Sequence, residues 1–177
     1  MFIYKMLFIN KDARVYCHLI MLILSVTGCK QTQDPEQNMV KDNQEHSISK
    51  AEVLTEKNRK IIEDFADIFY NQKDVAKAFD KYVSEGYIQH NSNILDGPKA
   101  AIDALKPKFS APTSSFEIKR ILVDGNMAVI HLHARMDNNF KGGAVADFYR
   151  LENGKIVEHW DVLQPISDNP INPRPMF

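Results

Sequence analysis

This sequence has few cysteines and no excess of charge of either sign. Two cysteines, Cys17 and Cys29, occur among 177 residues, and 22 basic against 23 acidic residues leave a formal charge of −1. A balanced charge gives no reason to expect a polyanionic partner, and no basic stripe interleaved with aromatic residues indicates nucleic-acid binding. Internal repeats and low-complexity runs are also absent. The composition, 44% hydrophobic and 25% charged, is typical of a globular domain and predicts one domain plus an additional segment.

Residues 1–28 have the features of a bacterial lipoprotein signal peptide. Lysines and an arginine make the start of the chain positive, and an apolar run of about 13 residues follows, which is too short to span a membrane. The run ends in residues 26–29 (VTGC), which resemble the bacterial lipobox. This resemblance implies cleavage before Cys29 and acylation of Cys29, with several acyl chains forming a stable membrane anchor.

The segment that follows the cleavage site is predicted to be a flexible tether. Residues 29–50 are polar with few large apolar side chains, so they cannot bury enough surface to become ordered. Cys17 would leave with the signal peptide and Cys29 would carry lipid, which excludes thiol catalysis. The prediction is therefore a domain of residues 51–177 outside the cytoplasm, held at the bacterial cell envelope by lipidated Cys29.

Helical periodicity begins near residue 51. Apolar residues recur at helical spacing with charged residues between them, which predicts an amphipathic helix over residues 51–71. A second helix is predicted over residues 74–83. A third is predicted over residues 98–106, where Pro98 suits the first helical turn.

After residue 114 the pattern changes to strands. These are predicted over residues 116–123, 127–136, 144–151 and 155–164, with a tight turn at Asn153-Gly154. The prolines of the remaining tail exclude a further central strand. Helices followed by meandering strands predict an α+β fold, in which N-terminal helices pack across a curved antiparallel sheet and enclose a pocket.

Several segments together resemble the SnoaL-like proteins of the nuclear-transport-factor-2-like (NTF2-like) superfamily. They are YIQHN (87–91), the Asp96-Gly97 turn, His131-x-His133, DFYR (147–150) and GKIVEHWDVLQP (154–165). The resemblance implies a cone-shaped α+β fold, a homodimer formed through the outer face of the sheet, and no cofactor. For the family's named member it implies an intramolecular aldol condensation that closes a polyketide ring. It also places the acid–base aspartate on the closing strands, at Asp161 or Asp147.

Asp147 and Asp161 are the candidate catalytic carboxylates. Asp147 lies within an apolar strand, where an unpaired acid is costly unless it faces a polar cavity. A two-residue turn would place Asp147 opposite Trp160 and on the other face from Asp161. A three-residue loop with a bulge would place Asp147 opposite His159 and on the same face as Asp161. Alternatively, one of the two carboxylates pairs with Arg150 or His159 in a buried ion pair that has only a structural role.

Histidine and aromatic residues supply the other candidates. His90 is expected to line the mouth of the pocket as a donor or base, beside Tyr87. His131 and His133 point to one face of their strand, so His133 is a catalytic candidate and His131 a ligand-binding one if that face is the inner one. An H-x-H pair can also bind metal, but the resemblance argues for a metal-free pocket. If the face is the outer one, both histidines lie at a dimer contact or in solvent. The residues expected to bind ligand are Tyr87, His131, His159, Trp160 and Arg150.

Two main functions are compatible with these residues. The first is cofactor-free acid–base chemistry, a proton transfer or an aldol-type reaction, on a small carbonyl compound. The second is a lipoprotein that binds a small hydrophobic molecule without changing it. Export favours the second, because a polyketide cyclase is expected beside its synthase in the cytoplasm. A third alternative is an interaction module that uses the face of the sheet.

Overall fold

The computed structural model describes the backbone of residues 35–177 and the side chains of residues 50–177. The predicted signal peptide and the predicted lipidation site at Cys29 lie outside the described residues. Among the helices of the described part, none is both long and apolar enough to cross a membrane.

Helices form the first half of the described chain. Helix α1 (Pro35–Ala66) continues into the π-helical turn η1 (Asp67–Asn71), and α2 (Val75–Tyr82) follows. Because α1 begins at Pro35 rather than near residue 51, it includes residues 35–50, which belong to the segment predicted as a flexible tether. The chain has no glycine or proline between Pro35 and Gly86, and proline suits the first turn of a helix, so nothing interrupts the helix there.

Helix α3 (Pro98–Phe109) starts at the predicted residue but ends later than predicted. It continues through Pro107, although proline disfavours a helical conformation in the residue before it. The last turn is held by Phe109, which is 5% exposed and whose ring lies 4.2 Å from Phe116 and 4.5 Å from Phe69. This extra turn brings Lys108 to the cavity described below.

Five strands form one curved sheet in the order β1-β5-β4-β3-β2. Their bounds are β1 (Val83–Gln89), β2 (Ser115–Asp124), β3 (Met127–Arg135), β4 (Gly143–Glu152) and β5 (Lys155–Pro165). Strand β1 was not predicted, because Gly86 and its exposed neighbours interrupt the alternation of apolar and polar residues. This strand pairs in parallel with β5. The sheet is therefore mixed, and antiparallel in its other three pairings rather than throughout.

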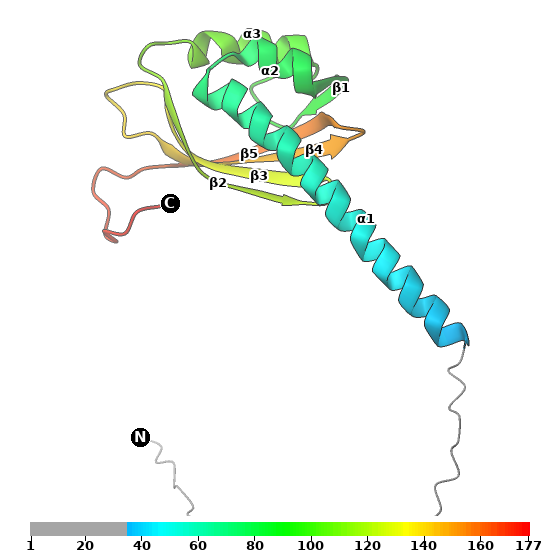
Figure 1. The fold of residues 1–177 in the computed structure, drawn as a ribbon. Coiled ribbons are helices and arrows are strands. Elements are labelled where there is room, and N and C mark those ends of the chain that lie inside the picture. The colour runs from blue at the N-terminus through cyan, green and yellow to red at the C-terminus, as the bar shows by residue number, and fades with distance from the viewer. Residues whose placement is uncertain (1–34) are drawn as a thin grey trace, which may run out of the picture.

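The helices cover one face of the sheet, and the C-terminal tail lies on the other side (Figure 1). Alternate residues of β3, including Ile130 and Leu132, point to the helix-covered inner face, where each is at most 1% exposed. Ile62 and Phe65 of α1 are equally buried and belong to the same core. The inner face thus holds the core and the cavity, while the intervening side chains point to the outer face.

The β4–β5 hairpin decides which side chains reach the cavity. Asn153 and Gly154 both have positive φ and form a two-residue turn, but the register then shifts so that Val157 is an extra residue on β5. As a result Asp147 lies directly opposite Asp161, and both predicted registers, opposite Trp160 or opposite His159, were wrong. The bulge places both carboxylates on one face without a three-residue loop.

Candidate functional site

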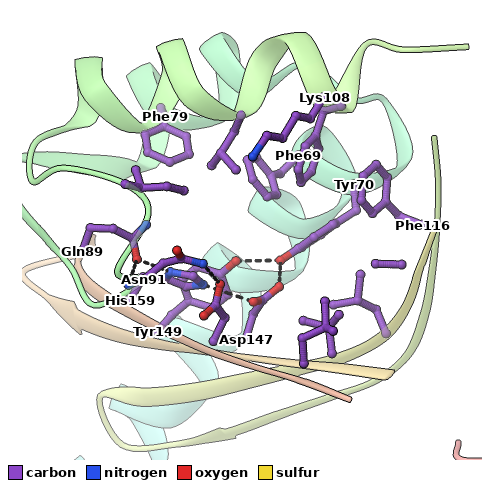
Figure 2. A pocket seen from close by; sticks show the side chains of 18 of the residues that line it. Phe69, Tyr70, Phe79, Gln89, Asn91, Lys108, Phe116, Asp147, Tyr149 and His159 are labelled. Carbon is purple, nitrogen blue, oxygen red and sulfur yellow. Dashed lines mark hydrogen bonds and ion pairs between the residues drawn. The ribbon is translucent and has the colours of Figure 1, made fainter. Parts of the chain in front are cut away.

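A cavity of about 330 Å³ lies between the helices and the inner face of the sheet. Its wall is mostly aromatic and aliphatic, with contributions from Phe65, Phe69, Phe79, Phe109, Phe116, Ile94, Leu105, Leu132, Val145 and Leu163. Polar side chains gather on the sheet side of this space (Figure 2). An apolar cavity with a few convergent polar groups is the usual form of a small-molecule site.

Asp147 of β4 is the buried carboxylate of the site. The hydroxyl of Tyr70 donates to Asp147 Oδ2 over 2.5 Å, and the hydroxyl of Tyr149 lies 2.7 Å from that of Tyr70. Tyr70 reaches this position from the π-helical turn η1, an irregularity that occurs frequently at functional sites. Because the proton of Tyr70 goes to Asp147, the proton of Tyr149 is the one that bridges the two tyrosines.

His159 of β5 completes the network, and its neighbours determine where its protons lie. The Oε1 atom of Gln89 accepts from the backbone N–H of Asn91 (3.0 Å), which fixes the orientation of the Gln89 amide. The same Oε1 lies 2.8 Å from His159 Nδ1, so Nδ1 carries a proton and donates it. His159 Nε2 then faces Asp147 Oδ1 at 3.2 Å, and a proton between these two atoms makes the pair favourable.

Tyr87 of β1 has a hydroxyl proton that the network does not use. Gln89 Nε2 donates to the Tyr87 oxygen over 3.0 Å, so the tyrosine acts as the acceptor in that bond. Among the described residues no acceptor takes its proton. Since Tyr87 lines the cavity and is 3% exposed, its hydroxyl is a donor available to a bound molecule.

Asp161 lines the same cavity but in a different environment. It is exposed, whereas Asp147 is 8% exposed, and its Oδ2 accepts from Asn91 Nδ2 over 2.5 Å. Asn91 thereby touches both parts of the site, since its backbone orients Gln89 and its side chain holds Asp161. The two carboxylates therefore have separate partners.

Comparison with known families and structures identifies the domain. The SnoaL-like domain family matches residues 62–159. The chain belongs to the SnoaL-like family. No curated protein matches the chain.

Solved structures similar to this SnoaL-like domain share its architecture at low sequence identity. An NTF2-like protein of unknown function from Mesorhizobium loti has a TM-score of 0.54 and 20% identity, over 62% of this chain and 93% of that one. A SnoaL-like protein of unknown function from Burkholderia thailandensis has a TM-score of 0.51 and 13% identity, over 63% of this chain and 98% of that one. An LEH-like epoxide hydrolase from M. tuberculosis has a TM-score of 0.50 and 17% identity, over 62% of this chain and 84% of that one. These similarities show the NTF2-like fold.

The structure brings four of the predicted site residues to the cavity of the SnoaL-like domain: Asp147, Asp161, Tyr87 and His159. The cavity also has polar residues that the sequence did not single out, among them Tyr70, Tyr149, Gln89 and Asn91. Tyr87, Gln89 and Asn91 are alternate residues of one segment, and this spacing could have indicated that Gln89 and Asn91 face the same way as Tyr87. Tyr70 had no such signal, because its direction depends on the π-helical turn.

Three predicted site residues form a separate cluster on the outer face. The His90 ring stacks on Trp160 with centroids 4.7 Å apart, and His90 Nε2 lies 2.8 Å from Glu158 Oε1. Arg150 Nε donates to Glu158 Oε2 over 2.6 Å. None of the three lines the cavity. Alternation along β4 places Arg150 on the opposite face from Asp147, and the register of β5 places Trp160 opposite Phe148 on that same outer face.

His131 and His133 also lie on the outer face. Their ring centroids are 5.7 Å and 5.0 Å from that of Phe177 in the C-terminal tail, and His133 Nε2 lies 2.7 Å from the Lys141 carbonyl oxygen. The inner face of β3 is formed by the alternate residues, so neither histidine lines the cavity, and the outer-face alternative of the sequence prediction applies to both. Among the described residues, no group of three or more His, Cys, Asp or Glu side chains could hold a metal ion.

Burial keeps the tyrosines of the cavity protonated. Desolvation raises the pKa of Tyr70 and of Tyr149 well above the usual value of 10.0, and the Asp147 charge acts in the same direction. Desolvation also raises the pKa of Tyr87. All three hydroxyls are therefore hydrogen-bond donors at any physiological pH.

These raised pKa values predict a loss of stability in alkali. Below pH 10 the tyrosines are protonated in both states, but above it Tyr70, Tyr87 and Tyr149 ionise in the unfolded chain first. The unfolded state then binds fewer protons, so the free energy of unfolding falls by about 1.4 kcal/mol per pH unit for each tyrosine. Urea unfolding between pH 8 and 11 measures this slope. A free energy that stays constant above pH 10 would contradict the prediction.

Proposed function

We propose that this SnoaL-like domain binds a small, largely apolar carbonyl compound and catalyses a cofactor-free proton transfer in its cavity. The observation that carries the proposal is the pairing of Asp147 with His159 next to a tyrosine hydroxyl, that of Tyr87, whose proton is uncommitted. Base, acid and hydrogen-bond donor are thus present in one apolar space of suitable volume.

The reaction would begin at the carbon next to the carbonyl group. In the ion-paired form, the Asp147 carboxylate takes a proton from this carbon, and the electron pair of the C–H bond moves to form an enolate. The enolate oxygen accepts a hydrogen bond from Tyr87, and the nearby His159 imidazolium balances its charge. Tyr70 and Tyr149 hold Asp147 in place throughout.

The protonated Asp147 can complete the reaction in two ways. It returns the proton to a different carbon, which is an isomerisation, or the enolate carbon attacks a second carbonyl carbon of the same molecule. In the second case a C–C bond forms, and the proton goes to the alkoxide oxygen, which completes an aldol reaction. Both use the same residues, and the substrate decides between them.

Deuterium exchange tests this proposal without knowledge of the natural substrate. A panel of small aromatic and aliphatic ketones and aldehydes is incubated with the full-length chain in deuterated buffer, and proton NMR follows the α-hydrogens. We expect enzyme-dependent exchange for at least one compound class. Binding without exchange for every compound would instead support a protein that holds a hydrophobic molecule without changing it.

We further propose that the domain is lipid-anchored through Cys29 at the cell envelope, outside the cytoplasm. The support is the short apolar run that ends in residues 26–29 (VTGC). Growth of expressing bacteria with an alkyne-labelled fatty acid should label the wild type and leave the Cys29→Ser variant unlabelled. Equal labelling of both would rule out this anchor.

A homodimer through the outer face of the sheet is proposed as well. This face carries the exposed apolar side chains of Ile88, Leu122 and Val162, which are 42%, 60% and 62% exposed. Sedimentation velocity should give a dimer for the wild type and a monomer for Val162→Asp, because a carboxylate in an apolar contact is costly. A wild type that sediments as a monomer would refute the proposal.

A further inference from the structure

Lys108 contributes the only ammonium group to the cavity wall, among the described residues that line it. It comes from the last turn of α3, on the helix side of the cavity, whereas Asp147 comes from the sheet side. Figure 2 shows the Lys108 amine directed into the space between these two layers. The residue is itself exposed, so it lies where the cavity opens to solvent.

This ammonium group has no partner among the residues whose side chains are described. Several other lysines do have one: Lys81 pairs with Asp64 at 2.8 Å, Lys99 pairs with Asp103 at 2.5 Å, and the Lys155 amine donates to a backbone carbonyl. Within residues 50–177, Lys108 forms no such ion pair or hydrogen bond. Its charge is therefore available to a molecule that enters the cavity.

The carboxylates of the cavity do not neutralise Lys108 directly. Asp147 accepts from Tyr70 and faces His159, and Asp161 accepts from Asn91. A ligand that spans the cavity would thus meet a cation at the opening, an apolar middle and the hydrogen-bonding network on the sheet side. A carboxylate suits the first position because a lysine ammonium attracts it and both can keep part of their hydration there.

We propose that Lys108 determines specificity by binding the carboxylate of the substrate, which makes the substrate a carbonyl compound with a carboxylate at its other end. This inference rests on the proposed function and names its substrate class. A monoanion fits better than a phosphate dianion, because the same cavity holds the negative charges of Asp147 and Asp161. The apolar middle, lined by Phe69, Phe79 and Leu105, would hold an aromatic or branched carbon skeleton.

Calorimetric titration of the full-length chain with matched probes tests this role independently of turnover. The probes are 4-phenylbutanoate, its neutral amide and the corresponding phosphonate. We expect the wild type to bind the carboxylate about tenfold more tightly than the amide, and more tightly than the phosphonate. Lys108→Met should remove the preference for the carboxylate, and Lys108→Arg should keep most of it. Lys106→Met, on the same helix but away from the cavity, is the matched control and should bind like the wild type.

The outcomes separate this proposal from the proposed function. Lys108 does not bind a substrate carboxylate if the wild type binds the carboxylate and the amide equally or binds neither of them. The same conclusion follows if Lys108→Met keeps the preference for the carboxylate. A preference for the phosphonate would overturn the choice of a monoanion. Asp147→Asn should keep the preference for the carboxylate while losing exchange activity, because Asp147 is proposed to take the proton from the α-carbon and not to bind the substrate carboxylate. Carboxylate preference without exchange of any α-hydrogen would uphold the role of Lys108 in binding and refute catalysis.

Discussion

Replacing Asp147 with asparagine should lower kcat for α-hydrogen exchange by about 100-fold to 10,000-fold and leave the fold intact. The loss follows because the amide cannot accept the proton, and general acid–base groups contribute about this much to rate. The fold should survive because asparagine can replace each bond of the carboxylate: its Oδ1 accepts from Tyr70, and its Nδ2 donates to a neutral His159. Exchange kinetics by NMR measure the effect, with thermal unfolding as the check on folding.

Asp161→Asn is the comparison that tells the two carboxylates apart. Asp161 is exposed and bonded to Asn91, and the tyrosine and histidine network does not include it. We therefore expect this variant to lose less than tenfold in kcat. If Asp161→Asn loses more activity than Asp147→Asn, the base is Asp161 and not Asp147.

Tyr87→Phe should lower kcat by about 100-fold to 1,000-fold, with a smaller effect on KM. The uncommitted hydroxyl proton is proposed to stabilise the enolate oxygen, and loss of one such donor has an effect of this size in other enzymes. The substitution also leaves Gln89 Nε2 without its acceptor, which should reduce the free energy of unfolding by about 1–3 kcal/mol. Steady-state kinetics and urea unfolding measure the two effects separately.

Tyr82→Phe is the matched control for the loss of a tyrosine hydroxyl. Tyr82 bonds to Asp64 at an exposed position and does not line the cavity. Its kcat should equal that of the wild type. An unchanged kcat in Tyr87→Phe, or an equal loss in Tyr82→Phe, would show that the Tyr87 hydroxyl does not act on the reacting oxygen.

The outer face gives a different expectation from the cavity. Its cluster of His90, Trp160, Arg150 and Glu158 is joined by side-chain hydrogen bonds and one ring stack, on the opposite side of the sheet from Asp147. The Glu158 pKa is lowered by its bonds to His90 and Arg150, as in a structural ion pair. These residues fit an interface or a stabilising role better than a catalytic one.

The sequence by itself determined the family of the domain and the order of its helices and strands apart from β1. Local signals were sufficient for this: apolar residues at helical spacing, alternation after residue 114, and a two-residue turn at Asn153-Gly154. The same signals identified Asp147 as a carboxylate that needed a polar partner. Each of them depends on neighbours in the chain.

Tertiary structure alone decided which side chains form the site. One extra residue, Val157, shifts the β5 register, which places Asp147 opposite Asp161 and turns Trp160 outward. The π-helical turn directs Tyr70 to Asp147 over a separation of 77 residues, and packing of Phe109 extends α3 far enough to present Lys108. A single-residue shift reverses the face of a strand, and long-range packing can override a local break such as Pro107. For that reason the candidate residues could be found in the sequence, but their arrangement could not.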